Sequence, residues 1–147
     1  MASVSTYLNF PGNTEEAFHF YQSVFGGEFF GGIYRYGDMP SYEGRPPLTD
    51  EEKIRVMHIA LPILGGHYLQ GTDVLPTMGY HLEPGNHIQI NLQPDNKPET
   101  DRLFQALSQG GQVRTPLQDM FWGGYYGACT DKFGIHWMFN CEEGVSK

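Results

Sequence analysis

The chain has few cysteines, no long apolar run and no secretory leader pattern, and each shortage excludes a class of protein. Its 147 residues include only Cys129 and Cys141, too few for the disulfide framework of a small secreted domain. No apolar run approaches the roughly 20 residues that span a membrane. The first ten residues, MASVSTYLNF, lack a basic segment followed by an apolar one. We therefore expect a cytoplasmic protein with two free thiols.

Basic residues are also scarce. Nine Lys and Arg residues stand against 17 Asp and Glu residues, which gives a formal net charge of −8. The basic residues are scattered along the chain, so a phosphate backbone or an anionic membrane surface would meet net repulsion. We expect neither a nucleic-acid partner nor a membrane partner.

Several catalytic signatures are missing as well. No G-x-S-x-G stretch occurs, so the nucleophile elbow of an α/β-hydrolase is not indicated. The stretch FGGEFFGG, residues 25–32, is rich in glycine but matches neither the phosphate-binding P-loop nor the dinucleotide fingerprint. The composition instead indicates one domain over residues 1–147, with a core of few, large side chains, because 39% of residues are hydrophobic and 14% aromatic. Nineteen glycines and ten prolines predict many turns and short strands.

The first half begins with the pattern of a strand and a helix. Residues 4–10 are rich in β-branched and aromatic types and precede a turn. Asn13 and Glu16 have the spacing of an N-cap and its capping-box partner, and Gly26–Gly27 predicts the helix stop. The apolar face of this helix recurs at helical spacing: Ala17, Phe20, Tyr21 and Val24. The segments expected to follow are a strand within 27–37, a long loop at 37–52, strands at 53–63 and 67–74, and a connector at 75–86.

The second half has the same order of elements. A strand at 87–93 precedes a helix that has Pro98 in its first turn and stops at Gly110–Gly111. Three strands are expected to follow, at 112–119, 125–131 and 135–141. YLNF at 7–10 aligns with QINL at 89–92 at an offset of 82, and the Gly-Gly pairs align at 84. This repeat predicts an α+β fold of two βαβββ modules, at about 3–75 and 86–142.

Two βαβββ modules in one short chain resemble the vicinal oxygen chelate superfamily, which includes glyoxalase I, extradiol dioxygenases and bleomycin-resistance proteins. The chain looks most like the PhnB-like subgroup. The stretches that carry this resemblance are YLNFPGNTEEAFHFYQSVFGGEF at 7–29, YGDMP at 36–40 and FWGGYYGACTDKFGIHWMFN at 121–140. The resemblance implies that the modules form half-barrels around a cavity. It also implies that metal-using members hold a divalent ion there with four side chains from the first and last strand of each module.

The four metal positions implied by the resemblance are filled unevenly. They fall at or next to Thr6, near Gln70, at His87 and at Met138. Threonine and methionine are poor ligands for hard divalent ions, which leaves His87 and Gln70 as an incomplete metal site. No cofactor is firmly implied, and a divalent metal is the one candidate.

The remaining candidates point to a ligand site. His58 has two interpretations, a core histidine or a pocket acid or base, because small shifts move its charge across neutral pH. The aromatic cluster around Trp122 either fills the core or forms the wall of an apolar pocket. The residues that we predict to bind a ligand are Tyr7, Asn9, His58, Gln70, His87, Gln89, Asn91, Phe121, Trp122, Tyr125 and His136.

The sequence thus favours a small-molecule-binding protein with an aromatic-walled, apolar cavity. We expect a homodimer, because the resemblance implies one and half-barrels leave strand edges to cover. The alternative is a divalent-metal-dependent lyase or dioxygenase that uses His87, Gln70 and a third ligand, with His136 the nearest candidate. A third possibility is a partner-binding module that uses the loop at 37–52.

Overall fold

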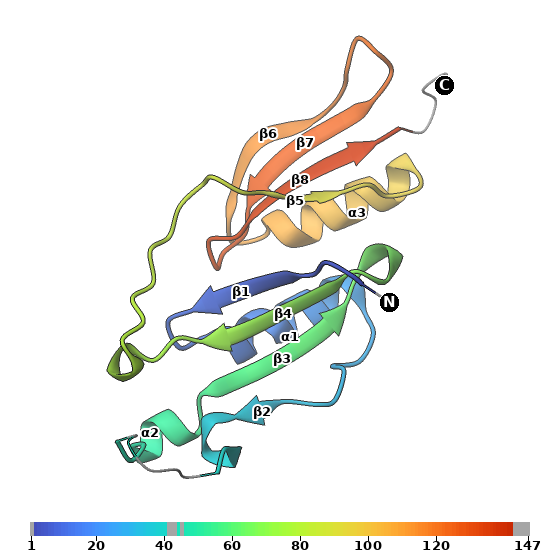
Figure 1. Cartoon of the computed structure of the whole chain (residues 1–147). Helices are drawn as coiled ribbons and strands as arrows, with labels where there is room; N and C mark the ends of the chain where they lie inside the picture. The colour runs from blue at the N-terminus through green and yellow to red at the C-terminus, as the bar shows by residue number, and fades with distance from the viewer. Residues whose placement is uncertain (1, 41–43, 45, 143–147) are drawn as a thin grey trace. The chain divides into compact units, whose positions relative to one another are not determined.

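The structure is a computed structural model, and it describes residues 2–40, 44 and 46–142. Of the predicted loop at 37–52, residues 41–43 and 45 lie outside the described part. The chain divides into two compact units, residues 1–83 and 84–147 (Figure 1). No helix in the described residues is long and apolar enough to cross a membrane.

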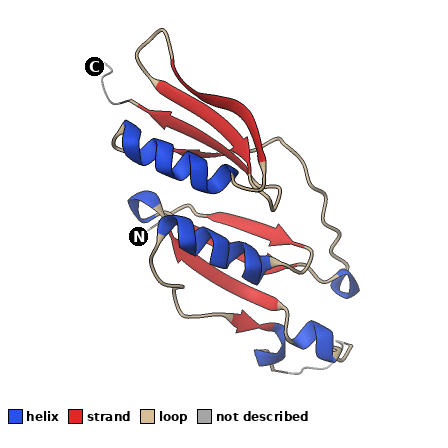
Figure 2. Ribbon diagram, turned by 180° about the vertical axis from the view of Figure 1, so that it is seen from behind, coloured by secondary structure: helices blue, strands red, loops and turns tan. Residues whose placement is uncertain are grey.

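The first unit is a four-stranded sheet with one long helix on one face (Figure 2). Its main elements are β1 (Thr6–Phe10), α1 (Thr14–Phe25), β2 (Tyr34–Arg35), β3 (Val56–Pro62) and β4 (Tyr68–Asp73). Its short helices are η1 (Tyr36–Asp38), α2 (Asp50–Lys53), η2 (Leu64–Gly66) and η3 (Pro76–Met78). The strand order is β1-β4-β3-β2. β1 is parallel to β4, and the other pairs are antiparallel.

The second unit repeats this arrangement. Its elements are β5 (Ile90–Leu92), α3 (Lys97–Ser108), β6 (Gln112–Asp119), β7 (Tyr125–Thr130) and β8 (His136–Cys141). The strand order is β5-β8-β7-β6, with β5 parallel to β8 and the other pairs antiparallel. The α+β fold class and the two βαβββ modules are therefore confirmed.

The core of each unit lies between the helix and one face of the sheet. In the first unit Leu8, Phe10, Leu61 and Leu69 are buried with α1, and in the second Trp137, Phe139, Leu103 and Leu107 are buried. The predicted face of α1 was wrong in one position, because Phe18 is fully buried whereas Phe20 is only half-buried. The reason is Gly71 in β4, where a Cβ atom would lie 2.5 Å from Phe18 Cε1. The missing side chain leaves room for the phenylalanine ring.

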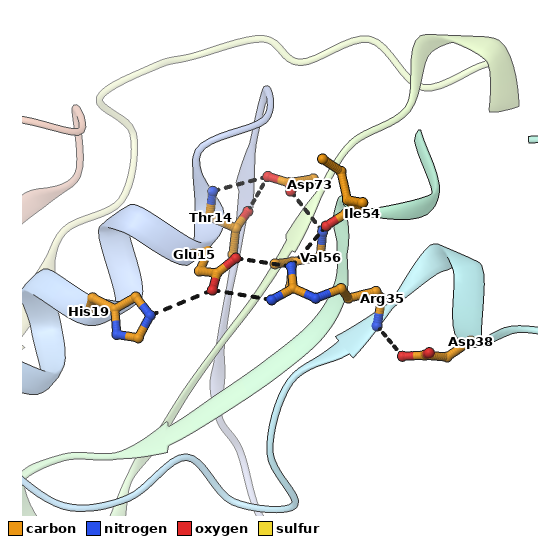
Figure 3. Close-up of polar contacts among 8 residues, drawn as sticks. All are labelled: Thr14, Glu15, His19, Arg35, Asp38, Ile54, Val56 and Asp73. Carbon is orange, nitrogen blue, oxygen red and sulfur yellow. Dashed lines mark hydrogen bonds and ion pairs between the residues drawn. The ribbon is translucent and has the colours of Figure 1, made fainter. Parts of the chain in front are cut away.

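The start of α1 is not capped by the predicted residue. Asn13 makes no side-chain cap hydrogen bond, and its buried Oδ1 has no partner among the described residues. Asp73, at the end of β4, takes that role (Figure 3): its Oδ1 accepts from Thr14 N at 3.0 Å and from Thr14 Oγ1 at 2.6 Å. Its Oδ2 accepts from Val56 N at 2.8 Å. One buried carboxylate therefore joins α1, β3 and β4.

Three predicted segments are shorter or more structured than expected. The strand predicted within 27–37 is reduced to β2, because Gly31 and Gly32 have φ of 76° and 79°, outside the extended region. The strand predicted at 87–93 begins only at Ile90. The predicted loop at 37–52 contains the end of η1 and the start of α2, and α2 has a capping box between Thr49 and Glu52.

The second glycines of the two Gly-Gly pairs are required for different reasons. Gly26 and Gly27 both have positive φ, 76° and 82°, which favours glycine. In the second pair Gly110 has φ of 76°, whereas Gly111 does not have a positive φ. A Cβ atom on Gly111 would instead overlap the carbonyl oxygen of Thr130. The second glycine of that pair is therefore required for close packing.

The short strand β2 is held to α1 by an ion pair (Figure 3). Arg35 donates from Nη1 to Glu15 Oε1 at 2.9 Å and to the carbonyl oxygen of Ile54 at 2.8 Å. The hydrogen bond from Arg35 lowers the pKa of Glu15 below its usual value. His19, one turn further along α1, lies 3.6 Å from the other oxygen of the same carboxylate.

The role of Asp73 can be tested with the near-isosteric variant Asp73→Asn. An amide would set an N–H₂ group against the Thr14 or Val56 donors and remove the charge, so we expect a loss of about 2 kcal/mol in the free energy of unfolding. The matched control is Asp50→Asn on exposed α2, which should change it by less than about 0.5 kcal/mol. Urea unfolding of both variants measures the difference. Equal stability of the two variants would contradict this account of Asp73.

Candidate functional site

The face of the first sheet away from α1 carries a cluster of polar and aromatic side chains. Successive side chains of a strand point to opposite faces of the sheet, so this cluster lies on the face away from the buried Leu8, Leu69 and Gly71. The cluster, called here the first helix-free face, consists of Tyr7, Asn9, Tyr34, His58, Gln70 and Thr72. Tyr7, Asn9, His58 and Gln70 were predicted, and the structure brings all four to this face. Tyr34 and Thr72 were missed, although the same alternation would have placed them.

His58 is the centre of this face. Its Nε2 lies 2.7 Å from Gln70 Oε1, so Nε2 carries the proton and the amide oxygen accepts it. The other end of the amide donates from Gln70 Nε2 to Ser5 Oγ at 2.7 Å. The rings of Tyr7 and Tyr34 lie with centroids 6.0 Å and 6.3 Å from the imidazole. The imidazole is thereby oriented by an amide and has a tyrosine on either side.

The same face continues toward a second group of hydroxyls. Tyr36 donates its phenol proton to the carbonyl oxygen of Asp73 at 2.7 Å, with Thr72 Oγ1 3.3 Å away. Burial raises the pKa of the Tyr7 phenol, the neighbouring Tyr36 adds to the rise, and a hydrogen bond with Thr72 lowers it. The phenol of Tyr7 is therefore neutral and able to donate a hydrogen bond at physiological pH.

The face of the second sheet away from α3 carries the second group of predicted residues. His136 Nδ1 lies 2.8 Å from Thr130 Oγ1, and its Nε2 donates to the carbonyl oxygen of Gly85 at 3.0 Å. Further along, Asn140 donates to Asn91 Oδ1 at 2.6 Å. This face, called here the second helix-free face, includes Asn91, Thr130, His136 and Asn140, and Gln89 joins it through its hydrogen bond with Arg114.

Arg114 is the functional candidate that sequence reasoning missed. It lies in β6, and its Nη2 donates to Gln89 Oε1 at 2.6 Å while its Nε donates to Thr130 Oγ1 at 3.1 Å. It lies at a register shift between Val113, which pairs with the buried Cys129, and Thr115, which pairs with Ala128, so alternation along 112–119 was a weak guide to its face. An arginine in a strand reads as an ordinary solvated residue, so the pattern alone gave no reason to select it.

The predicted aromatic wall does not lie on one face. Phe121 and Trp122 are in the turn between β6 and β7, with side chains 97% and 52% exposed and ring centroids 5.0 Å apart. Tyr125 points to the helix side, where its phenol donates to Asp101 Oδ1 at 2.5 Å. The structure therefore separates Tyr125 from His136 and Asn91.

The fold that carries these two faces is shared with known proteins. Residues 5–139 match the family model of the Glyoxalase/Bleomycin resistance protein/Dioxygenase superfamily. The chain belongs to this superfamily. It is also 30% identical to Protein YjdN of Escherichia coli over 144 residues, with 93% of each chain covered. The crystal structure of protein PA1353 from Pseudomonas aeruginosa is similar at a TM-score of 0.82 and 37% identity, with 97% of this chain and 98% of that chain covered.

A PhnB protein from Bacillus cereus shares the fold at a TM-score of 0.72 and 24% identity, with coverage of 95% of this chain and 99% of that chain. The superfamily predicted from the sequence is confirmed, and a PhnB protein is among its structural neighbours.

The superfamily implies a divalent metal, and the four matching positions do not fit one. Thr6 Oγ1 is bonded to His67 Nε2 at 2.8 Å, and the Gln70 oxygen accepts from His58. His87 lies exposed in a bend before β5, not in the strand as predicted, and Met138 offers only a thioether. In the described part of the chain, no group of three or more His, Cys, Asp or Glu side chains could hold a metal ion. No chemical step is therefore assigned to a metal.

The orientation of Tyr125 toward α3 can be tested by titration. The hydrogen bond to the Asp101 carboxylate raises the pKa of Tyr125 to about 12, and burial adds to the rise. A raised pKa means that the contribution to stability is present below about pH 10 and is lost as the pH rises through about 12. Phenolate absorbance should therefore show a tyrosine that ionises near pH 12, which Tyr125→Phe removes and Asp101→Asn shifts to lower pH. An unchanged titration in Tyr125→Phe would contradict the assignment.

Proposed function

We propose that this protein binds a small, partly aromatic organic molecule, and that binding needs no divalent metal. The observation that supports the proposal best is the arrangement around His58. Tyr7 and Tyr34 are 48% and 46% exposed, and they lie on either side of an imidazole that Gln70 orients. Half-exposed rings beside oriented polar groups are typical of ligand sites, where rings supply contact area and a few polar atoms set the orientation.

The polar groups of the first helix-free face complement a ligand that has both donors and acceptors. The neutral Tyr7 phenol offers a donor, and Asn9 already donates to the Tyr80 hydroxyl at 3.0 Å. In the neutral tautomer that donates from Nε2 to Gln70, His58 Nδ1 carries no proton and offers an acceptor. We propose His58, Tyr7 and Gln70 as the central binding residues, with Asn9 beside them.

The second helix-free face supplies the other predicted binding residues. We propose Gln89, Asn91 and His136 as polar contacts on that face, with Phe121 and Trp122 as apolar contacts. The exposure of these two rings supports the proposal, because a ligand or another chain that covered them would remove apolar surface from water. His87 and Tyr125 have weaker support, since one is exposed in a bend and the other bonds to α3.

A metal-dependent lyase or dioxygenase is the second candidate function, and the superfamily's name is the observation that favours it. The poor donor chemistry of Thr6 and Met138 argues against it. We further propose that the protein is PhnB-like, forms one domain and is cytoplasmic.

The ligand-binding proposal can be tested by isothermal titration calorimetry, after a thermal-shift screen of a metabolite library with EDTA present. We expect a hit that binds in EDTA. His58→Ala and Gln70→Ala should weaken this binding at least about tenfold, or about 1.4 kcal/mol. The matched controls are His19→Ala on α1 and Gln105→Ala on α3, both exposed, and they should leave the affinity unchanged. Loss of binding in EDTA, or a stoichiometric metal in protein purified without chelator, would favour the metalloenzyme instead.

We also propose a homodimer. Among the strands that the structure describes, the edge strands of each sheet have one unpaired side within their own unit: β1 and β2 in the first, and β5 and β6 in the second. Such edges are commonly covered by a partner. Sedimentation equilibrium at micromolar concentration should therefore give twice the mass of one chain. The mass of a single chain throughout that range would refute the dimer.

A further inference from the structure

Arg114 differs from the other described arginines in its partners. Arg35, Arg55 and Arg102 form ion pairs with Glu15, Glu51 and Glu99 at 2.9, 2.9 and 2.5 Å. Within the described residues Arg114 pairs with no carboxylate, and all its hydrogen-bond acceptors are neutral. In a chain with a net charge of −8, such a guanidinium is an un-neutralised positive charge on the second helix-free face.

Four hydrogen bonds fix the position of this guanidinium. Nε donates to Thr130 Oγ1 at 3.1 Å, and Nη2 donates to Gln89 Oε1 at 2.6 Å. Nη2 also donates to the carbonyl oxygens of Cys129 and Trp137 at 3.1 and 3.2 Å. Between them these acceptors come from β7, β8 and the residue before β5. Because the guanidinium is already held in place, it should lose little further conformational entropy when a ligand binds.

One side of the guanidinium is left for a further acceptor. Arginine has five N–H donors, and the four hydrogen bonds use Nε and Nη2. No hydrogen bond of Nη1 is found within the part of the chain that the structure describes. The nearest acidic residue in sequence to this cluster, Asp131, has its carboxylate directed to Phe133 N, Ile135 N and Trp137 Nε1. It is therefore directed away from Arg114.

We propose that Arg114 is an anion-binding residue that receives, through Nη1, a carboxylate or phosphate group of a small molecule bound on the second helix-free face. This inference rests on the part of the proposed function that places ligand contacts on the second helix-free face, and it specifies the ligand of that face as an anion. The alternative is that Arg114 only clamps strands together. A clamp needs donors but no charge, whereas an anion site needs the charge, because hydrogen bonds between ionised groups are roughly twice as strong as neutral ones.

The test uses three probes of similar shape: benzoate, phenyl phosphate and the uncharged benzamide. NMR titration of the full chain follows the arginine side-chain Nε–H signals, assigned with Arg114→Gln. We expect benzoate or phenyl phosphate to shift the Arg114 signal in a saturable way and benzamide to bind at least tenfold more weakly. Benzoate and phenyl phosphate separate a carboxylate from a phosphate ligand. Arg102→Gln on α3 is the matched control and should bind as the wild type does.

Arg114→Gln should weaken binding of the anionic probe at least tenfold. If that variant fails to fold, Arg114→Lys keeps the charge and should keep the preference for benzoate over benzamide. Equal affinity for benzoate and benzamide in the wild type, unchanged benzoate binding in folded Arg114→Gln, or no shift at Arg114 up to the solubility limit would each overturn the proposal. A neutral library ligand that binds in EDTA and is lost in His58→Ala would leave the proposed function intact while this inference fails.

Discussion

The parallel pairing of each unit's first strand with its last is the constraint on which the rest of the structure depends. β1 pairs with β4, and β5 with β8, although the other strands of each unit come between them in sequence. The chain must leave the first strand and cross to the far edge of the sheet, and α1 and α3 make that crossing. Because one helix covers one face of each sheet, every second residue of a strand is buried against that helix. The residues between them lie on the other face, where polar side chains are found. Asp73 joins the parallel strand pair to the helix. It pairs with Phe10 at the end of β1 and β4, and its side chain accepts a hydrogen bond from Thr14, the first residue of α1.

Local sequence patterns predicted the elements well and their long-range partners badly. The glycine stops, the two helices and the strand at 112–119 follow from short stretches of sequence, so they were found with nearly correct bounds. The cap of α1 was assigned to Asn13 because its spacing to Glu16 is right, but the acceptor that bonds Thr14 lies 59 residues away. The burial of Phe18 depends on the absence of a side chain at Gly71. Neither fact is visible from the residues near the helix.

The candidate site was likewise predicted where local patterns decide it and missed where long-range contacts do. Strand alternation was enough to gather Tyr7, Asn9, His58 and Gln70 on one face, because the period of two is a property of the backbone. It was not enough to choose among residues on that face, since a hydrogen bond such as that between Arg114 and Gln89 depends on which strands are neighbours. The aromatic cluster was grouped by proximity in sequence, and Tyr125 left it because its own strand directs it to α3.

The two Gly-Gly pairs have a consequence for how internal repeats are interpreted. Gly26 and Gly27 meet a torsional requirement that asparagine can partly satisfy, whereas Gly111 meets a steric one that every L-residue with a Cβ violates. Glycines at equivalent places in the two halves thus meet different physical requirements. Substitution rates at the pairs should diverge among descendants, with the second glycine of the second pair the slowest to change.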